Sequence, residues 1–151
     1  MSSIQFGHER LRVYQEAIRF IAWVETLVKS ATINSAMKDQ LERAAASIAL
    51  NIAEGNAKAT NRERCRFIDF ARGSAFECAA CLDVLVARDV LDFTVSCEGK
   101  QILHGIVSML VGLRRSASVV ARETEAEYGR PSDGIDRDYD RDHDDESGLA
   151  E

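Results

Sequence analysis

Two glutamates in neighbouring helical patterns have the chemistry of an acid–base pair. Glu54 lies in the segment QLERAAASIALNIAEG (residues 40–55), and Glu77 lies in FIDFARGSAFE (residues 67–77). Carboxylates that face each other can exchange protons with a substrate. Neither glutamate has a histidine, a glycine-rich phosphate loop or a nucleophile motif near it in the sequence. We therefore expect no catalytic residue and no enzymatic activity.

The cysteines offer a second kind of chemistry, because Cys78 and Cys81 form a C-x-x-C. A redox-active pair usually opens a helix that follows a strand, whereas this pair lies inside a long helical pattern. Cys65, Cys97 and His104 do not complete a known zinc spacing with it. We interpret the cysteines as small buried side chains with reduced thiols, and we expect no metal and no cofactor.

A basic cluster offers a third kind of chemistry, the binding of phosphate groups. Four cations lie within nine residues and are opposed only by Glu63: Lys58, Arg62, Arg64 and Arg66. Lysine and arginine bind nucleic-acid phosphates without reading the bases, so RNA and DNA are the expected partners. The sequence predicts few exposed aromatic side chains, which indicates little sequence preference. A solvated charged surface with no partner is the alternative.

A polar stripe runs through the alanine-rich segment and predicts a helix–helix seam. Ser47, Asn51 and Glu54 share one helical face, and Gly73, Ser74 and Glu77 fall together on the next helix. Glycine inside a helix costs about 1 kcal/mol relative to alanine, so we expect another backbone to approach Gly73 closely. A leucine at position 73 should then be severely destabilising. A binding surface is the alternative interpretation of the same stripe.

Four long helical patterns must position these groups. Apolar residues recur at spacings of three and four, and no segment alternates as a strand does. The expected ranges are about 8–29, 35–57, 60–90 with Thr60 and Glu63 as a capping box, and 96–128 with Ser96 as the cap. The prediction is an all-α, up-down antiparallel four-helix bundle.

The first and last of these helices carry apolar arcs wider than one packing seam needs. In the first, Leu11, Tyr14, Ile18 and Ile21 form one stripe, and a second stripe runs beside it. Apolar surface of that extent on a monomer would be a large exposed patch. The arcs therefore predict a homo-oligomer.

The formal net charge of −6 comes from the C-terminal end of the chain. Residues 129–151 hold nine acidic and three basic side chains, while residues 1–128 hold 16 of each. We expect residues 1–128 to form the bundle and residues 129–151 to be a disordered acidic tail. Asp140, Asp142, Asp144 and Glu151 have calcium-loop spacing, but Asp145 stands where that loop needs glycine, so no calcium site is expected. The tail either solubilises the protein or weakly screens its basic surface.

No stretch of the sequence has the length of a membrane span or the pattern of a secretory signal, so a cytoplasmic protein is expected. Three ordered segments carry a family resemblance: LRVYQEA (residues 11–17), QLERAAASIALNIAEG and FIDFARGSAFE. Together they resemble the four-helix-bundle family of proteins encoded in intervening sequences of bacterial 23S rRNA genes. The resemblance covers about residues 6–120. Ala49 stands where many relatives have proline, and Glu42 where many have a basic residue.

The resemblance implies a fold and an assembly rather than a reaction. Relatives are bundles arranged as five-fold rings, so a closed homopentamer is expected. Some relatives resemble the accessory variability determinant of diversity-generating retroelements, which implies a reverse transcriptase and nucleic acid as partners. The expected function is thus that of a nucleic-acid-binding or reverse-transcriptase-accessory adaptor. The alternative is a protein–protein scaffold with no nucleic-acid role.

Overall fold

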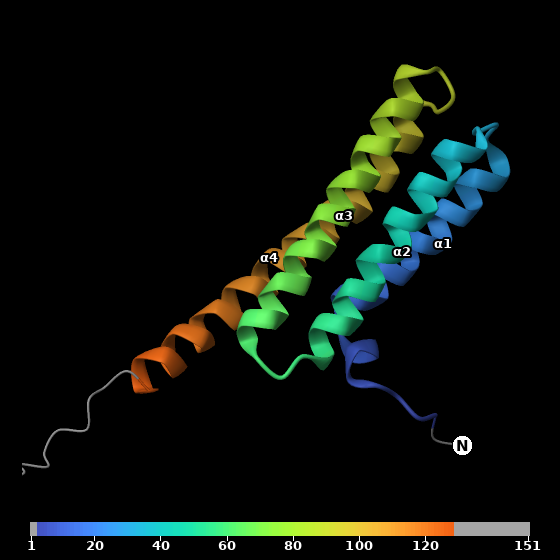
Figure 1. The fold of residues 1–151 in the computed structure, drawn as a ribbon. Coiled ribbons are helices and arrows are strands. Elements are labelled where there is room, and N and C mark those ends of the chain that lie inside the picture. The colour runs from blue at the N-terminus through green and yellow to red at the C-terminus, as the bar shows by residue number, and fades with distance from the viewer. Residues whose placement is uncertain (1–2, 129–151) are drawn as a thin grey trace, which may run out of the picture.

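The computed structural model describes residues 3–128 and contains no strand among them. A short 3-10 helix, η1 (Gly7–Arg10), precedes four α-helices: α1 (Arg12–Ser30), α2 (Ser35–Ala57), α3 (Asn61–Ala87) and α4 (Phe93–Tyr128) (Figure 1). The all-α fold with four helices is therefore confirmed. The acidic tail expected for residues 129–151 lies outside the described residues.

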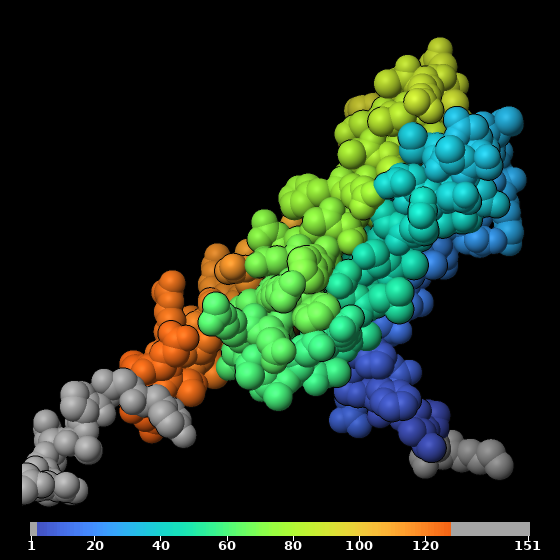
Figure 2. Space-filling model, in the orientation of Figure 1, coloured from blue at the N-terminus to red at the C-terminus, as the bar shows by residue number. Residues whose placement is uncertain are grey.

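The helices lie side by side along a common long axis (Figure 1). Each helix packs against its neighbour in sequence, and α1 also packs against α4; the α2–α3 and α3–α4 pairs are the most extensive. The N-terminal segment projects from the body near the end of the molecule where α4 extends past the other helices (Figure 2). None of the helices in the described part has an apolar stretch long enough to cross a lipid bilayer.

Side chains placed before α2 and α3 explain where these two helices begin. Asn34 Oδ1 accepts a hydrogen bond from the Met37 backbone N–H at 2.9 Å, and Thr60 Oγ1 accepts one from the Glu63 N–H at 3.2 Å. Both bonds satisfy an N–H group that has no partner within the helix. The Glu63 carboxylate accepts its bond from the Thr60 hydroxyl, at 2.8 Å, rather than from the backbone as in the expected capping box.

Helices α1 and α4 begin at residues other than those expected. Residues 7–10 form the separate helix η1, because the backbone of Leu11 is extended and interrupts the helical run. Helix α4 begins at Phe93 rather than at Ser96, with the Asp92 carbonyl accepting the Ser96 N–H at 3.1 Å. Ser96 is therefore not a cap; it is a buried residue inside the first turn. Helix α3 ends at Ala87, and the chain turns through Asp89, whose φ is 58°.

The core takes up most of both apolar arcs. On α1 the stripe of Val13, Ala17, Phe20, Val24 and Leu27 is buried, and three residues of the other stripe pack against the core from its edge: Leu11, Tyr14 and Ile21. On α4 the buried residues are Leu103, Ile106 and Leu110, and Ile102, Val107 and Leu113 pack against the core from its edge. Four-helix packing thus accounts for much of the apolar width that had indicated a partner, because each helix contacts two others.

Several large apolar side chains nevertheless remain outside the core. Leu50 on α2 and Phe76 on α3 are 67% and 57% exposed, and Ile18 and Phe93 are also exposed. Phe70 falls on the same helical stripe as Phe67, Ala71 and Cys78, and this spacing predicts a core position; its side chain is instead 45% exposed. The core face of α3 runs instead through Ile68, Ala71, Ala75, Cys78 and Leu82, which places Phe70 at its margin.

Two glycines other than Gly73 are the points of close approach. A methyl group at Gly55 would lie 2.9 Å from Cβ of Phe67, and one at Gly99 would lie 2.7 Å from Cζ3 of Trp23 and 2.9 Å from Cδ1 of Leu82. Gly73 is exposed, and a methyl group there would meet no atom within 4 Å. The expected close packing at Gly73 is therefore wrong, because this position faces away from α2.

This geometry reverses the prediction for Gly73. Gly73→Ala should raise the free energy of unfolding by up to about 1 kcal/mol, since alanine restricts the unfolded chain without a clash. Gly99→Ala should lower it by about 1–3 kcal/mol, because Trp23 and Leu82 must shift. Urea denaturation followed by circular dichroism measures both. A loss of stability in Gly73→Ala would contradict the assignment.

Candidate nucleic-acid interface

The four cations of the predicted basic cluster divide between two surfaces. Residues on one helix are 100° apart, so Arg62 and Arg66, one turn apart, share a direction that Arg64 cannot share. Arg62 and Arg66 are exposed beside α4, whereas Arg64 is half-buried at the interior end of the bundle. Lys58 follows α2, with its Nζ atom 3.5 Å from Glu54 Oε1 and 4.8 Å from the ring centroid of Phe67. The structure does not bring the four cations together.

Arg62 and Arg66 instead join two arginines of α4, Arg114 and Arg122, around a groove of about 550 Å³. We call this groove between α3 and α4 the basic groove. Its lining is completed by two acids, an aromatic ring and three small side chains: Asp69, Glu125, Phe70, Cys65, Ser118 and Ala121. Four arginines against two acids make the groove a net cationic surface on a body that is close to neutral overall.

The four arginines of the basic groove differ in whether a carboxylate pairs with them. Arg114 Nε donates to Asp69 Oδ1 at 2.7 Å, and this hydrogen bond raises the pKa of Arg114. Within residues 3–127, no carboxylate lies in ion-pair distance of Arg62, Arg66 or Arg122. Guanidinium groups without an internal partner can form paired hydrogen bonds with phosphate oxygens.

Phe70 adds an aromatic surface to the basic groove. Its ring is partly exposed, and the Arg66 guanidinium lies 5.4 Å from its centroid. A ring beside a cationic wall provides a surface on which a nucleic-acid base can stack. The sequence interpretation missed this role because it placed Phe70 in the core. It also missed Arg122, although Arg114, Ser118 and Arg122 follow each other at spacings of four along one helix face.

The predicted polar seam is only partly a contact between helices. Ser74 Oγ donates to Ser47 Oγ at 2.9 Å across α2 and α3, while Asn51 Nδ2 donates to the Ser47 carbonyl at 2.8 Å within its own helix. Glu77 accepts a hydrogen bond from Gln40, and Glu54 pairs with Lys58. Gln40 and Glu54 are 14 residues apart on α2, about 20 Å along the helix, so the two glutamates do not face each other.

The cysteines are free thiols, and the C-x-x-C pair is buried in the core. Burial raises the pKa of Cys78 to about 12, with Cys81 and Glu77 as smaller causes, and burial also raises the pKa of Cys81. A thiolate is therefore scarce at neutral pH, and a redox role would need the thiolate. Residues 3–127 contain no cluster of three or more His, Cys, Asp or Glu side chains placed to hold a metal ion.

The described residues form an all-α fold with a net cationic groove between α3 and α4. Comparison with known families shows where this fold belongs: residues 9–112 match the family described as 23S rRNA-intervening sequence protein, and the chain belongs to it. No curated protein matches the chain.

Among solved structures, the fold is similar to a protein of unknown function from the S23 ribosomal protein family of Bacteroides thetaiotaomicron VPI-5482. The two sequences are 18% identical, and the alignment covers 68% of this chain and 97% of that one with a TM-score of 0.64. At this level of identity the likeness concerns the fold alone.

The raised pKa values predict the order in which the thiols react. In the native protein at pH 8, iodoacetamide should modify the half-buried Cys65 and Cys97 before Cys78 and Cys81, because the buried pair lacks both access and thiolate. Peptide mass spectrometry measures the order, and protein unfolded in urea is the control in which all four react. Early alkylation of Cys78 in folded protein would contradict its placement.

Proposed function

We propose that the chain is a non-enzymatic, homo-oligomeric adaptor that binds nucleic acid through the basic groove. The observation that carries this proposal is the convergence of Arg62, Arg66 and Arg122 on one face, none of them with a carboxylate at ion-pair distance in residues 3–127. Phosphate binding requires only such a density of cations, because the released counterions supply the favourable free energy. Phe70 would add stacking with any base, so affinity should depend on charge more than on sequence.

The assembly we propose is a closed ring of up-down antiparallel bundles, with the pentamer favoured. Short connections at alternate ends of the helices in Figure 1 support the up-down arrangement. The exposed Ile18, Leu50 and Phe76 support a protein partner, since isolated large apolar side chains are stabilised when an interface covers them. A ring would repeat the basic groove around an axis, and several modest cationic surfaces would then act on one nucleic acid.

The partners follow from the same reasoning. Membership of the family, together with the resemblance to retroelement accessory proteins, supports RNA or DNA and a reverse transcriptase as partners in the cytoplasm. A protein–protein scaffold with no nucleic-acid role is the second candidate, and the exposed apolar side chains favour it.

Charge reversal in the basic groove tests nucleic-acid binding. We expect the double variant Arg62→Glu with Arg66→Glu to lose affinity for single-stranded RNA of any sequence, and its log–log salt slope should become shallower by about 1.4, the value for two lost phosphate contacts. Fluorescence anisotropy across a salt series measures both quantities. Arg88→Glu is the control and is compared with Arg62→Glu alone, because each single reversal changes the net charge by the same amount; Arg88 is an exposed arginine beyond the C-terminus of α3 and away from the groove.

Two outcomes would contradict this proposal. Equal weakening by the Arg88→Glu control would show that overall charge, and not the groove, determines binding. If the parent protein retains neither RNA nor DNA at low salt, the scaffold function replaces the adaptor function.

Light scattering tests the assembly separately. Multi-angle detection on a sizing column should give a multiple of the 16.7 kDa chain mass, five-fold for the favoured ring, and the mass should not change with salt if apolar contacts hold the ring. Leu50→Lys should reduce the mass if this side chain lies in the interface. A monomer at micromolar concentration would overturn the proposed assembly.

A further inference from the structure

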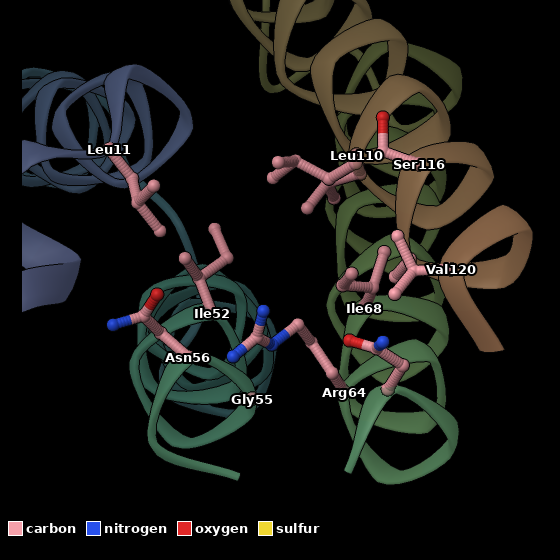
Figure 3. A pocket seen from close by; sticks show the side chains of 12 residues that line it. Leu11, Ile52, Gly55, Asn56, Arg64, Ile68, Leu110, Ser116 and Val120 are labelled. Atoms are coloured by element: carbon pink, nitrogen blue, oxygen red, sulfur yellow. The ribbon is translucent and has the colours of Figure 1, made fainter. Parts of the chain in front are cut away.

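A second cavity lies at the end of the bundle where the chain passes from α2 to α3. It has a volume of about 250 Å³ and lies between the C-terminal end of α2, the first turns of α3 and residues 110–120 of α4, with Leu11 on its far side (Figure 3). Most of its wall is apolar: Leu11, Ile52, Ile68, Leu110, Leu113, Ala117 and Val120. The polar part of the wall comes from Asn56, Asn61, Ser116 and Arg64. An apolar pocket with a few polar groups on one side is the usual form of a small-molecule site.

Arg64 is the unusual member of this wall. Its side chain extends from α3 towards α2, beside Ile52 and Asn56 (Figure 3). Its Nε atom is buried and has no hydrogen-bond partner among the described residues, and Nη2 reaches only the Lys58 carbonyl, at 3.5 Å. Arg72 has a similarly placed Nε, but its Nη1 lies 3.7 Å from Asp69 Oδ1. Arg64 has no carboxylate within ion-pair distance in residues 3–127.

An arginine held against apolar side chains without a counter-charge is costly to the folded state. Burying part of a guanidinium removes water from it, and only an anionic partner restores the lost interaction in full. The local sequence supplies none, because Glu63 is bonded to Thr60 and Glu54 pairs with Lys58. A ligand with a carboxylate would provide the missing partner, and Asn56 and Asn61 stand beside Arg64 to donate further hydrogen bonds.

The size of the cavity limits what can accompany that carboxylate. An apolar cavity of about 150 Å³ holds a benzene molecule. A space of about 250 Å³ therefore accepts a somewhat larger apolar body, such as an unbranched chain of several carbons. A nucleotide would not fit this description, because its base and sugar are polar and the wall around Leu110 and Leu113 offers them no partners.

We propose that this cavity binds a small anionic amphiphile, a medium-chain carboxylate, with its head group on Arg64 and its tail among Ile52, Ile68 and Leu110. The site is separate from the basic groove, which lies on the other side of α3, and the proposal does not depend on nucleic-acid binding. The ligand would contact α2, α3 and α4 at the end of the bundle where the chain passes from α2 to α3.

Calorimetric titration of the full-length protein with octanoate, below its micelle concentration, tests the proposal. We expect saturable binding by octanoate and binding roughly ten- to hundredfold weaker by 1-octanol, which has the same tail without the charge. Arg64→Met should weaken octanoate by a similar factor and leave octanol unchanged. Arg62→Met removes a neighbouring arginine of the basic groove and is the matched control, with octanoate affinity equal to that of the parent.

A second variant keeps the test decisive if Arg64→Met fails to fold. Ala117→Leu places extra carbon atoms in the apolar part of the cavity, so it should weaken octanoate and octanol together while the circular dichroism spectrum stays native. The proposal is overturned if octanoate does not bind the parent, if octanol binds as tightly as octanoate, or if folded Arg64→Met binds octanoate as the parent does. It is also overturned if folded Ala117→Leu retains full affinity for octanoate.

Discussion

The close packing of α2 against α3 is the constraint on which the rest of the structure depends. The small side chains of the buried alanines on α2, and the absence of a side chain at Gly55, allow α3 to approach closely. Phe67 therefore lies against the α2 backbone. The Ser47–Ser74 hydrogen bond crosses the same seam further along. With only Lys58 to Thr60 between the two helices, the rotation of α3 about its own axis is fixed from its first turn.

That rotation decides the chemistry of each side chain at the start of α3. Arg62 and Arg66 are directed outward to α4, where they meet Arg122 and the fixed pair of Arg114 and Asp69. Arg64 is directed inward, into an open cavity between α2, α3 and α4. One cationic segment of the sequence thus supplies two sites of different character. The first is an exposed, net cationic groove, where we propose that a polyanion binds, and the second is a largely apolar cavity, where we propose a small ligand with one charge.

Several polar groups away from these two sites are satisfied locally. Asn51 bonds within α2, Glu77 bonds Gln40, and the buried thiols of Cys78 and Cys81 are held neutral by their surroundings. Each of these groups therefore already has a partner or is protonated. In the part of the chain that the structure describes, the buried side-chain nitrogens without a hydrogen-bond partner belong to arginines, namely Nε of Arg64 and Nε of Arg72.

By itself, the sequence determined the four α-helices, the start of α2 at Ser35, the cap of α3 at Thr60 and the family, because periodicity and capping are local properties of the chain. Only the tertiary structure decided which glycines lie at close contacts, that Phe70 is exposed, and that Arg64 lines a cavity while Arg62 and Arg66 line the groove beside α4. Those outcomes depend on how far each helix is rotated against its neighbours. That rotation is set by side-chain volumes contributed from several helices at once, which no single segment of the sequence contains.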